Sequence, residues 1–76
     1  MPDAASRLQK KFGETLRLER RLRKLSQEKL ALESGISMTY VGEIERGEKM
    51  ASLQTVVRLA KALGMTGGAL MAKAGL

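Results

Sequence analysis

The chain has 76 residues and a net charge of +6, and it contains neither cysteine nor histidine. This composition excludes disulfides, zinc fingers and thiol chemistry, so we expect no metal site, cofactor, small-molecule ligand or enzyme activity. The positive charge indicates either a polyanionic partner or a basic, soluble surface. No apolar run approaches the roughly 20 residues of a membrane span, and the first residues lack a secretion signal, so we expect a cytoplasmic protein without membrane contact.

The apolar pattern predicts five helices and no strand, so the expected fold class is all-α, in a single domain over residues 1–76. The first helix is expected over residues 3–24. Its apolar stripe would consist of Leu8, Phe12 and Leu16, which are four residues apart. Gly13 weakens the interior of this helix, but its small size would let a neighbour pack closely.

A pair of short helices is expected within residues 26–47. Ser26 would cap the first of them, and Gly35 would end it in a left-handed conformation. Ser37 would cap the second, and Gly47 would end it. Two helices joined by such a tight turn need a small residue where they touch, an apolar residue after the turn, and two buried positions on the second helix. These requirements are met by Ala31, Ile36, Val41 and Ile44.

The last two helices are expected over residues 52–64, with Ser52 as the cap, and over residues 66–74. The apolar stripe of the fourth helix would be Leu53, Val56, Ala60 and Leu63, which follow a 3-4-3 spacing. The apolar residues near the end of the chain either pack as a satellite of the core or form a symmetric dimer contact. We favour a dimerisation segment over residues 60–76. Its contact residues would be Met65, Leu70, Met71 and Leu76.

Four segments carry a resemblance to a known family. They are Leu-Ser-Gln-Glu-Lys-Leu-Ala (25–31), Ser-Gly-Ile-Ser (34–37), Tyr-Val-Gly-Glu-Ile-Glu-Arg-Gly (40–47) and Ser-Leu-Gln-Thr-Val-Val-Arg-Leu-Ala-Lys-Ala-Leu-Gly (52–64). Residues 12–64 thereby resemble the phage-repressor-like helix-turn-helix domains of the Cro/C1, or Xre, type. With Thr39 and Tyr40, the chain is also similar to some controller proteins of restriction-modification systems. The resemblance implies a five-helix bundle of the lambda-repressor type that acts as a homodimeric, sequence-specific transcriptional regulator on double-stranded DNA.

The resemblance also implies roles for individual residues, with residues 37–46 lying in the major groove. Base edges would be contacted by Met38, Thr39, Tyr40 and Glu43. Phosphate would be contacted by Gln27, Ser37, Arg46 and Lys49, together with the backbone after Gly47. A partly buried ion pair would join Arg20 to Glu45. The chemistry is compatible, because helix N-termini present free N–H groups to anions and a carboxylate can accept from a cytosine amino group.

A structural alternative stays open for three of these residues. Gln27 would then be a solvated first-turn residue, Tyr40 would be partly buried against the bundle, and Glu43 would be an ordinary exposed acid. Two positions also depart from the family pattern. Lys24 stands where glycine is usual, and Met50-Ala51 stands where Asn-Pro is common.

Charge is unevenly distributed along the chain. Residues 7–24 carry eight basic side chains and two acidic ones, whereas residues 26–48 carry five acidic and two basic ones. The acidic balance of the second segment keeps open a different class of function, a protein-interaction module that does not touch DNA. A third possibility is an antitoxin-like regulator that binds both DNA and a protein partner, which would need an additional binding segment.

Overall fold

The computed structural model describes residues 3–76, which form five helices and no strand. The helices are α1 (Ala4–Leu22), α2 (Gln27–Ser34), α3 (Met38–Glu45), α4 (Leu53–Ala62) and α5 (Gly67–Lys73). The all-α, five-helix prediction is confirmed. The predicted domain starts at Met1, which lies with Pro2 outside the described residues. No described helix combines the length and the apolar character needed to cross a membrane.

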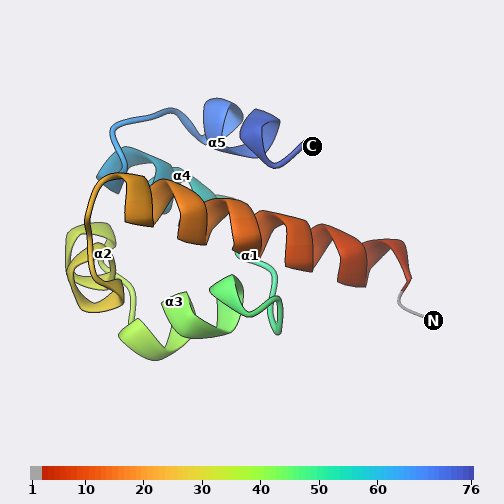
Figure 1. Cartoon of the computed structure of the whole chain (residues 1–76), viewed down its shortest axis with the longest axis horizontal. Coiled ribbons are helices and arrows are strands. Elements are labelled where there is room, and N and C mark those ends of the chain that lie inside the picture. The colour runs from red at the N-terminus through yellow and green to blue at the C-terminus, as the bar shows by residue number, and fades with distance from the viewer. Residues whose placement is uncertain (1–2) are drawn as a thin grey trace.

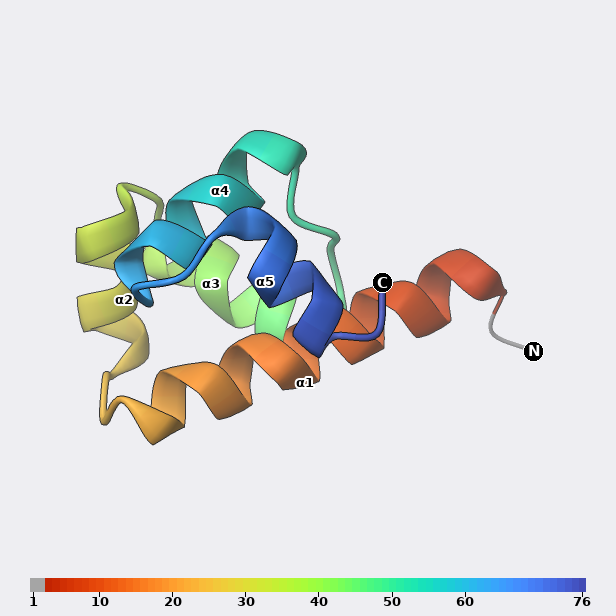
Figure 2. The same cartoon turned by 90° about the horizontal axis from the view of Figure 1, so that it is seen from above.

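The long helix α1 organises the bundle. α3 and α5 contact it from different sides, and its first turns extend beyond the other helices (Figure 1, Figure 2). α2 packs on both α3 and α4, and α4 packs on α5. The helix-turn-helix pair, α2 and α3, therefore lies on one side of α1, and α5 lies on another.

Each helix begins after a residue whose side-chain oxygen accepts a hydrogen bond from the backbone N–H three residues later, at 2.8–3.1 Å. This bond satisfies one of the free N–H groups of the first turn. The capping residues are Asp3, Ser26, Ser37, Ser52 and Thr66. The predicted helix starts are confirmed. They could be predicted from the sequence because capping depends only on neighbouring residues.

The end of α1 differs from the prediction. The helix stops at Leu22 rather than at residue 24, because Lys24 has a left-handed φ of 57°. A non-glycine residue in this conformation costs about 1 kcal/mol or more. Gly35 has a φ of 72° and ends α2 as predicted, without that cost. Lys24, which stands where the family pattern usually has glycine, therefore forms a left-handed turn.

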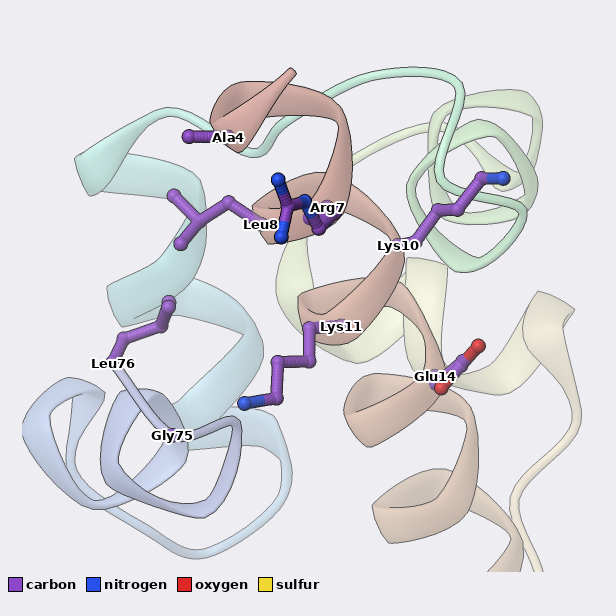
Figure 3. Close-up of a pocket in the computed structure, with 8 residues that line it drawn as sticks. All are labelled: Ala4, Arg7, Leu8, Lys10, Lys11, Glu14, Gly75 and Leu76. Carbon is purple, nitrogen blue, oxygen red and sulfur yellow. The ribbon is translucent and has the colours of Figure 1, made fainter. Parts of the chain in front are cut away.

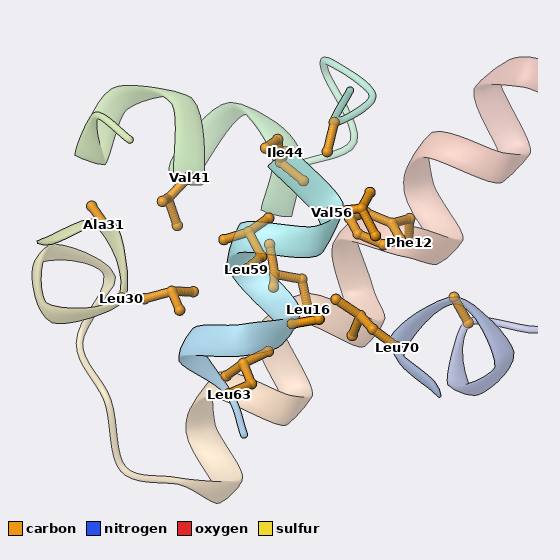
Figure 4. Close-up of a cluster of buried hydrophobic side chains, with 13 residues drawn as sticks. Phe12, Leu16, Leu30, Ala31, Val41, Ile44, Val56, Leu59, Leu63 and Leu70 are labelled. Atoms are coloured by element: carbon orange, nitrogen blue, oxygen red, sulfur yellow. The ribbon is translucent and has the colours of Figure 1, made fainter. Parts of the chain in front are cut away.

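The core contains side chains from all five helices (Figure 4). Leu8 is 41% exposed and Leu53 is 74% exposed, so neither predicted apolar stripe is buried along its whole length. Leu8 borders a groove with Gly75 and Leu76, and Leu59 occupies the buried side of α4 in place of Leu53. The core members are Phe12, Leu16, Leu30, Ala31, Val41, Ile44, Ala51, Val56, Leu59, Ala60, Leu63, Leu70 and Ala74.

The backbones of α1 and α3 approach each other closely at Gly13. A β-carbon at this position would overlap the carbonyl oxygen of Ile44 and lie 2.8 Å from that of Glu45. The expectation that Gly13 permits close packing is confirmed. The approach fixes α3 against α1 and so determines which side of α3 faces outward.

Candidate nucleic-acid interface

The helix α3 has a buried side and an exposed side. Val41 and Ile44 are fully buried, as the sequence predicts. Met38 is 51% exposed and Thr39 is also exposed, and both lie in the first turn. In helix-turn-helix complexes this first turn contacts the base edges of the major groove. The exposed surface needed for such contacts is present, and the contacts themselves stay predictions.

Tyr40 joins α3 to the start of α4. Its ring is half-buried against the core, and its hydroxyl oxygen accepts a hydrogen bond from the backbone N–H of Ser52 at 3.4 Å. This matches the structural alternative for Tyr40. The hydroxyl hydrogen has no acceptor among the described residues and remains available as a donor. Tyr40 thus supports the position of α3 and still presents one polar hydrogen.

Ser37 and Gln27 stand at the beginnings of α3 and α2. The hydroxyl oxygen of Ser37 accepts from the backbone N–H of Tyr40 at 3.0 Å, which leaves the hydroxyl hydrogen free to donate. Gln27 is half-buried and donates from Nε2 to Oε1 of Glu45 at 3.0 Å. Gln27 is therefore held in place rather than simply solvated, and the second hydrogen on its Nε2 is available to an anion.

The structure brings Arg20 and Glu45 together in a two-point ion pair. Arg20 donates from Nε to Oε2 of Glu45 at 2.6 Å and from Nη2 to Oε1 at 3.0 Å, and the two side chains are only 10% and 3% exposed. Arg20 also donates from Nη1 to the carbonyl oxygen of Leu25 at 2.8 Å. The hydrogen bond to Glu45 raises the pKa of Arg20. We call Arg20, Gln27 and Glu45 the junction, because they link α1, α2 and α3.

Two ion pairs follow the junction at the end of α3, one exposed on both sides and one in which the acid, Glu43, is only 24% exposed. Arg46 donates from Nε to Glu48 at 2.8 Å, and Nζ of Lys49 lies 3.3 Å from Oε2 of Glu43. The hydrogen bond between Arg46 and Glu48 raises the pKa of the arginine and lowers that of the glutamate. Exposed pairs of this kind contribute about 0–1 kcal/mol. A phosphate can therefore replace either acid as the partner of the cation at little cost.

The backbone after Gly47 does not match its predicted role. The N–H groups of Glu48 and Lys49 both donate to the carbonyl oxygen of Glu43, at 2.9 and 3.4 Å. They close the end of α3 and are not free for phosphate. The prediction of a backbone contact there was wrong for these two groups, because the carbonyls at a helix end need donors of their own.

Only some of the predicted dimer residues are accessible to a second chain. Leu70 is fully buried inside its own chain, so it has no surface to offer a second chain and we remove it from the predicted contact. Met65 and Met71 are half-buried at the edge of the core. Leu76, 40% exposed, borders a groove with α1 instead.

An exposed apolar face on α4 was missed. Leu53 and Val57 are 74% and 52% exposed, and they are four residues apart on one side of the helix. A β-carbon at Gly67 would lie 3.4 Å from Cγ2 of Val57, so this face continues onto the start of α5. The four-residue spacing was a readable signal, but Leu53 also fits the apolar stripe predicted for this helix.

Comparison with known proteins identifies the family. The sequence pattern described as Helix-turn-helix matches residues 16–70, well over half of the chain. The chain belongs to this helix-turn-helix family. By family it is a DNA-binding transcription regulator of the Cro/C1 type rather than a member of an enzyme family.

Several relatives share most of the chain with this helix-turn-helix protein. Control protein C.SmaI of Serratia marcescens is 42% identical over 65 residues, which cover 86% of this chain and 77% of that protein. Control protein C.BamHI of Bacillus amyloliquefaciens is 45% identical over 56 residues, with coverages of 71% and 68%. The solved structure of the restriction-modification controller protein C.AhdI from Aeromonas hydrophila has a TM-score of 0.79 at 44% identity and covers 82% of this chain and 94% of that one. The predicted similarity to controller proteins is confirmed.

Proposed function

We propose that this protein is a sequence-specific transcriptional regulator that binds double-stranded DNA as a homodimer on an operator with two half-sites. The observation that carries the proposal is α3, whose inner side is held in the core while its first turn, with Met38 and Thr39, is exposed. In protein–DNA complexes, phosphate contacts set register and groove-facing side chains select sequence. Around α3 the chain has both kinds of residue, donors for phosphate and exposed side chains that can face the groove.

The phosphate contacts would come from donors grouped around α3. Gln27 and Ser37 each keep a free hydrogen, while Arg46 pairs with the exposed Glu48 and Lys49 pairs with Glu43, which is 24% exposed. When Lys49 turns to a phosphate it releases the carboxylate of Glu43, which can then accept a hydrogen bond from a cytosine amino group. In this way binding to the backbone would prepare Glu43 to read a base.

The relatives support a more specific role. Two are named control proteins and a third is described as a restriction-modification controller protein. We therefore propose that the operator of this regulator belongs to a restriction-modification system. A regulator of such a system works on cytoplasmic DNA.

The proposed dimer uses the apolar face of α4 and α5. A two-fold interface buries the same patch on both subunits. The exposed Leu53 and Val57 supply such a patch on α4, and the half-buried Met65 and Met71 would add to it. Two copies would present their α3 helices to half-sites about 34 Å apart on one face of the duplex.

The main test is selection of bound duplexes from a random pool, followed by salt titration on the recovered sequence. We expect an inverted repeat with half-site centres about 10 base pairs apart. The affinity should fall with salt at a log–log slope of about −0.9 for each phosphate neutralised. No binding at low salt would favour a protein-interaction module, and a single unrepeated site would contradict the dimer.

The role of Glu43 is tested by Glu43→Gln on the selected duplex and on all single-base variants of it. The expected result is a changed preference at one base pair, with little change in non-specific affinity. Glu33→Gln removes the same charge from α2 and is the matched control. If Glu43→Gln tightens binding to every sequence by one factor, Glu43 reads no base.

The dimer face is tested by Val57→Glu in sedimentation measurements. A buried charge at the interface should shift the protein to monomer and weaken operator binding. Leu32→Glu is the control, because Leu32 is 75% exposed and lies on α2, away from this face. Unchanged dimerisation of Val57→Glu would contradict the proposed interface.

A further inference from the structure

The side of α1 that faces away from the core carries a stripe of charge. Its members follow the three- and four-residue spacing of one helix face. They are Arg7, Lys10, Glu14, Arg17 and Arg21. Four of the five are cations, and among residues 3–76 none of these cations takes part in an ion pair. We call these five residues the charged stripe.

The middle of the charged stripe borders the end of α3. Lys10 and Arg17 border one hollow together with Glu45 and Arg46 from the end of α3. The aliphatic part of the Lys10 side chain packs closely on Gly47. A β-carbon added at Gly47 would lie 2.8 Å from Cγ and 3.0 Å from Cα of Lys10. The side chain of Lys10 is exposed beyond this contact. The charged stripe therefore continues the surface on which Arg46 stands.

The neighbouring lysine points the other way. Both lysines border one groove with Arg7, Glu14 and Leu76, but Lys11 extends toward Gly75 and Leu76, whereas Lys10 extends away from them (Figure 3). A β-carbon at Gly75 would lie 2.8 Å from Nζ of Lys11. Of the two lysines, only Lys10 also borders the hollow at the end of α3.

We propose that Lys10 and Arg17, with Arg7, form a second phosphate-binding surface, which holds the sugar–phosphate backbone next to the groove that α3 enters. This inference rests on the proposed function, because α3 must be on DNA for the charged stripe to meet it. A helix rises 1.5 Å per residue, so the ten residues from Arg7 to Arg17 cover about 15 Å. That length matches about four phosphates along one strand of the duplex.

The chemistry of the charged stripe indicates which kind of ligand it binds. It presents unpaired cations in a row and only one acid, Glu14, so it matches an extended polyanion. Its first turns project past the rest of the bundle (Figure 1). They would therefore contact backbone outside the base pairs that α3 covers, and the contact would depend on flanking DNA rather than on operator sequence.

The test compares Lys10→Gln with Lys11→Gln on two duplexes, the selected operator alone and the operator with eight added base pairs on each flank. Glutamine keeps the Cβ and Cγ of Lys10, and thermal melting checks that both variants fold. On the long duplex, Lys10→Gln should bind about three- to tenfold more weakly, with a salt slope shallower by about 0.9. Lys11→Gln should bind like the wild type, and Lys10→Arg should keep full affinity.

On the short duplex the difference between the two variants should shrink or vanish. Equal affinities of wild type and Lys10→Gln on the long duplex would overturn this inference and leave the proposed function standing. Equal losses in Lys10→Gln and Lys11→Gln would also overturn it, because they would indicate general attraction by net charge. If the wild type binds neither duplex, the proposed function fails and this inference fails with it.

Discussion

The ion pair in the junction and the ion pairs at the end of α3 differ in burial, and this gives the two regions different uses. In the junction, Arg20 and Glu45 are 10% and 3% exposed and bind each other at two points. At the end of α3, Arg46 and Glu48 are 58% and 54% exposed. Buried charges that lose a partner remain unpaired in a low dielectric, whereas exposed charges regain water. The junction can therefore hold α3 in place, and the end of α3 can exchange partners for phosphate.

The largest expected effect comes from breaking the junction. Arg20→Met leaves Glu45 buried without its cation and should lower the free energy of unfolding by about 3 kcal/mol. Replacing both residues, in Arg20→Met/Glu45→Met, should recover much of that loss. Urea denaturation of the single and double variants measures both effects. A loss below about 1 kcal/mol for Arg20→Met would mean that this pair behaves like the exposed ones.

The next effect concerns the close approach that positions the junction. Gly13→Ala forces a β-carbon against the carbonyl oxygens of Ile44 and Glu45 and should destabilise the protein by about 1–3 kcal/mol, despite the better helix propensity of alanine. Gly68→Ala is the matched control, since nothing lies within 4 Å of a β-carbon there. In thermal melting, the Tm of Gly68→Ala should equal or exceed that of the wild type. Equal stability of both variants would contradict the tight contact between α1 and α3.

A smaller gain is expected beside the junction, at the left-handed Lys24. Lys24→Gly removes the strain of the φ of 57° and should stabilise the protein by roughly 0.5 kcal/mol, after the greater freedom of glycine in the unfolded chain is subtracted. Lys24→Ala removes the same charge but keeps the β-carbon, so it should bring no gain. If both variants stabilise equally in urea denaturation, the cause is the lost charge and not the backbone.

The smallest expected effect is at the end of α3. Glu48→Gln frees Arg46 and should strengthen non-specific DNA binding about two- to fivefold, without a change in unfolding free energy. The control is Glu33→Gln, which removes the same charge from the exposed ion pair between Glu33 and Lys29. This pair is on α2, which lies beside the start of α3 rather than its end (Figure 1). Fluorescence anisotropy at low salt measures both. An equal gain in the two variants would show that net charge alone is responsible.

Much of the fold could be read from short-range signals. The caps at Ser26, Ser37 and Ser52 and the turn at Gly35 depend on residues three or four apart, so the sequence predicted them without knowledge of packing. The burial of Val41 and Ile44 also follows from a local spacing. The pairing of Arg20 with Glu45 came from the family resemblance, because the two residues are far apart in the chain.

The amino-acid sequence by itself determined where the helices begin, which residues join α2 to α3, and that the chain belongs to a family of DNA-binding regulators. Only the tertiary structure decided that Leu53 is exposed, that Leu70 is buried, and that Lys10 and Lys11 face different neighbours. The physical reason is that helix periodicity assigns residues to a face, but which face is covered depends on where other helices end and cross it.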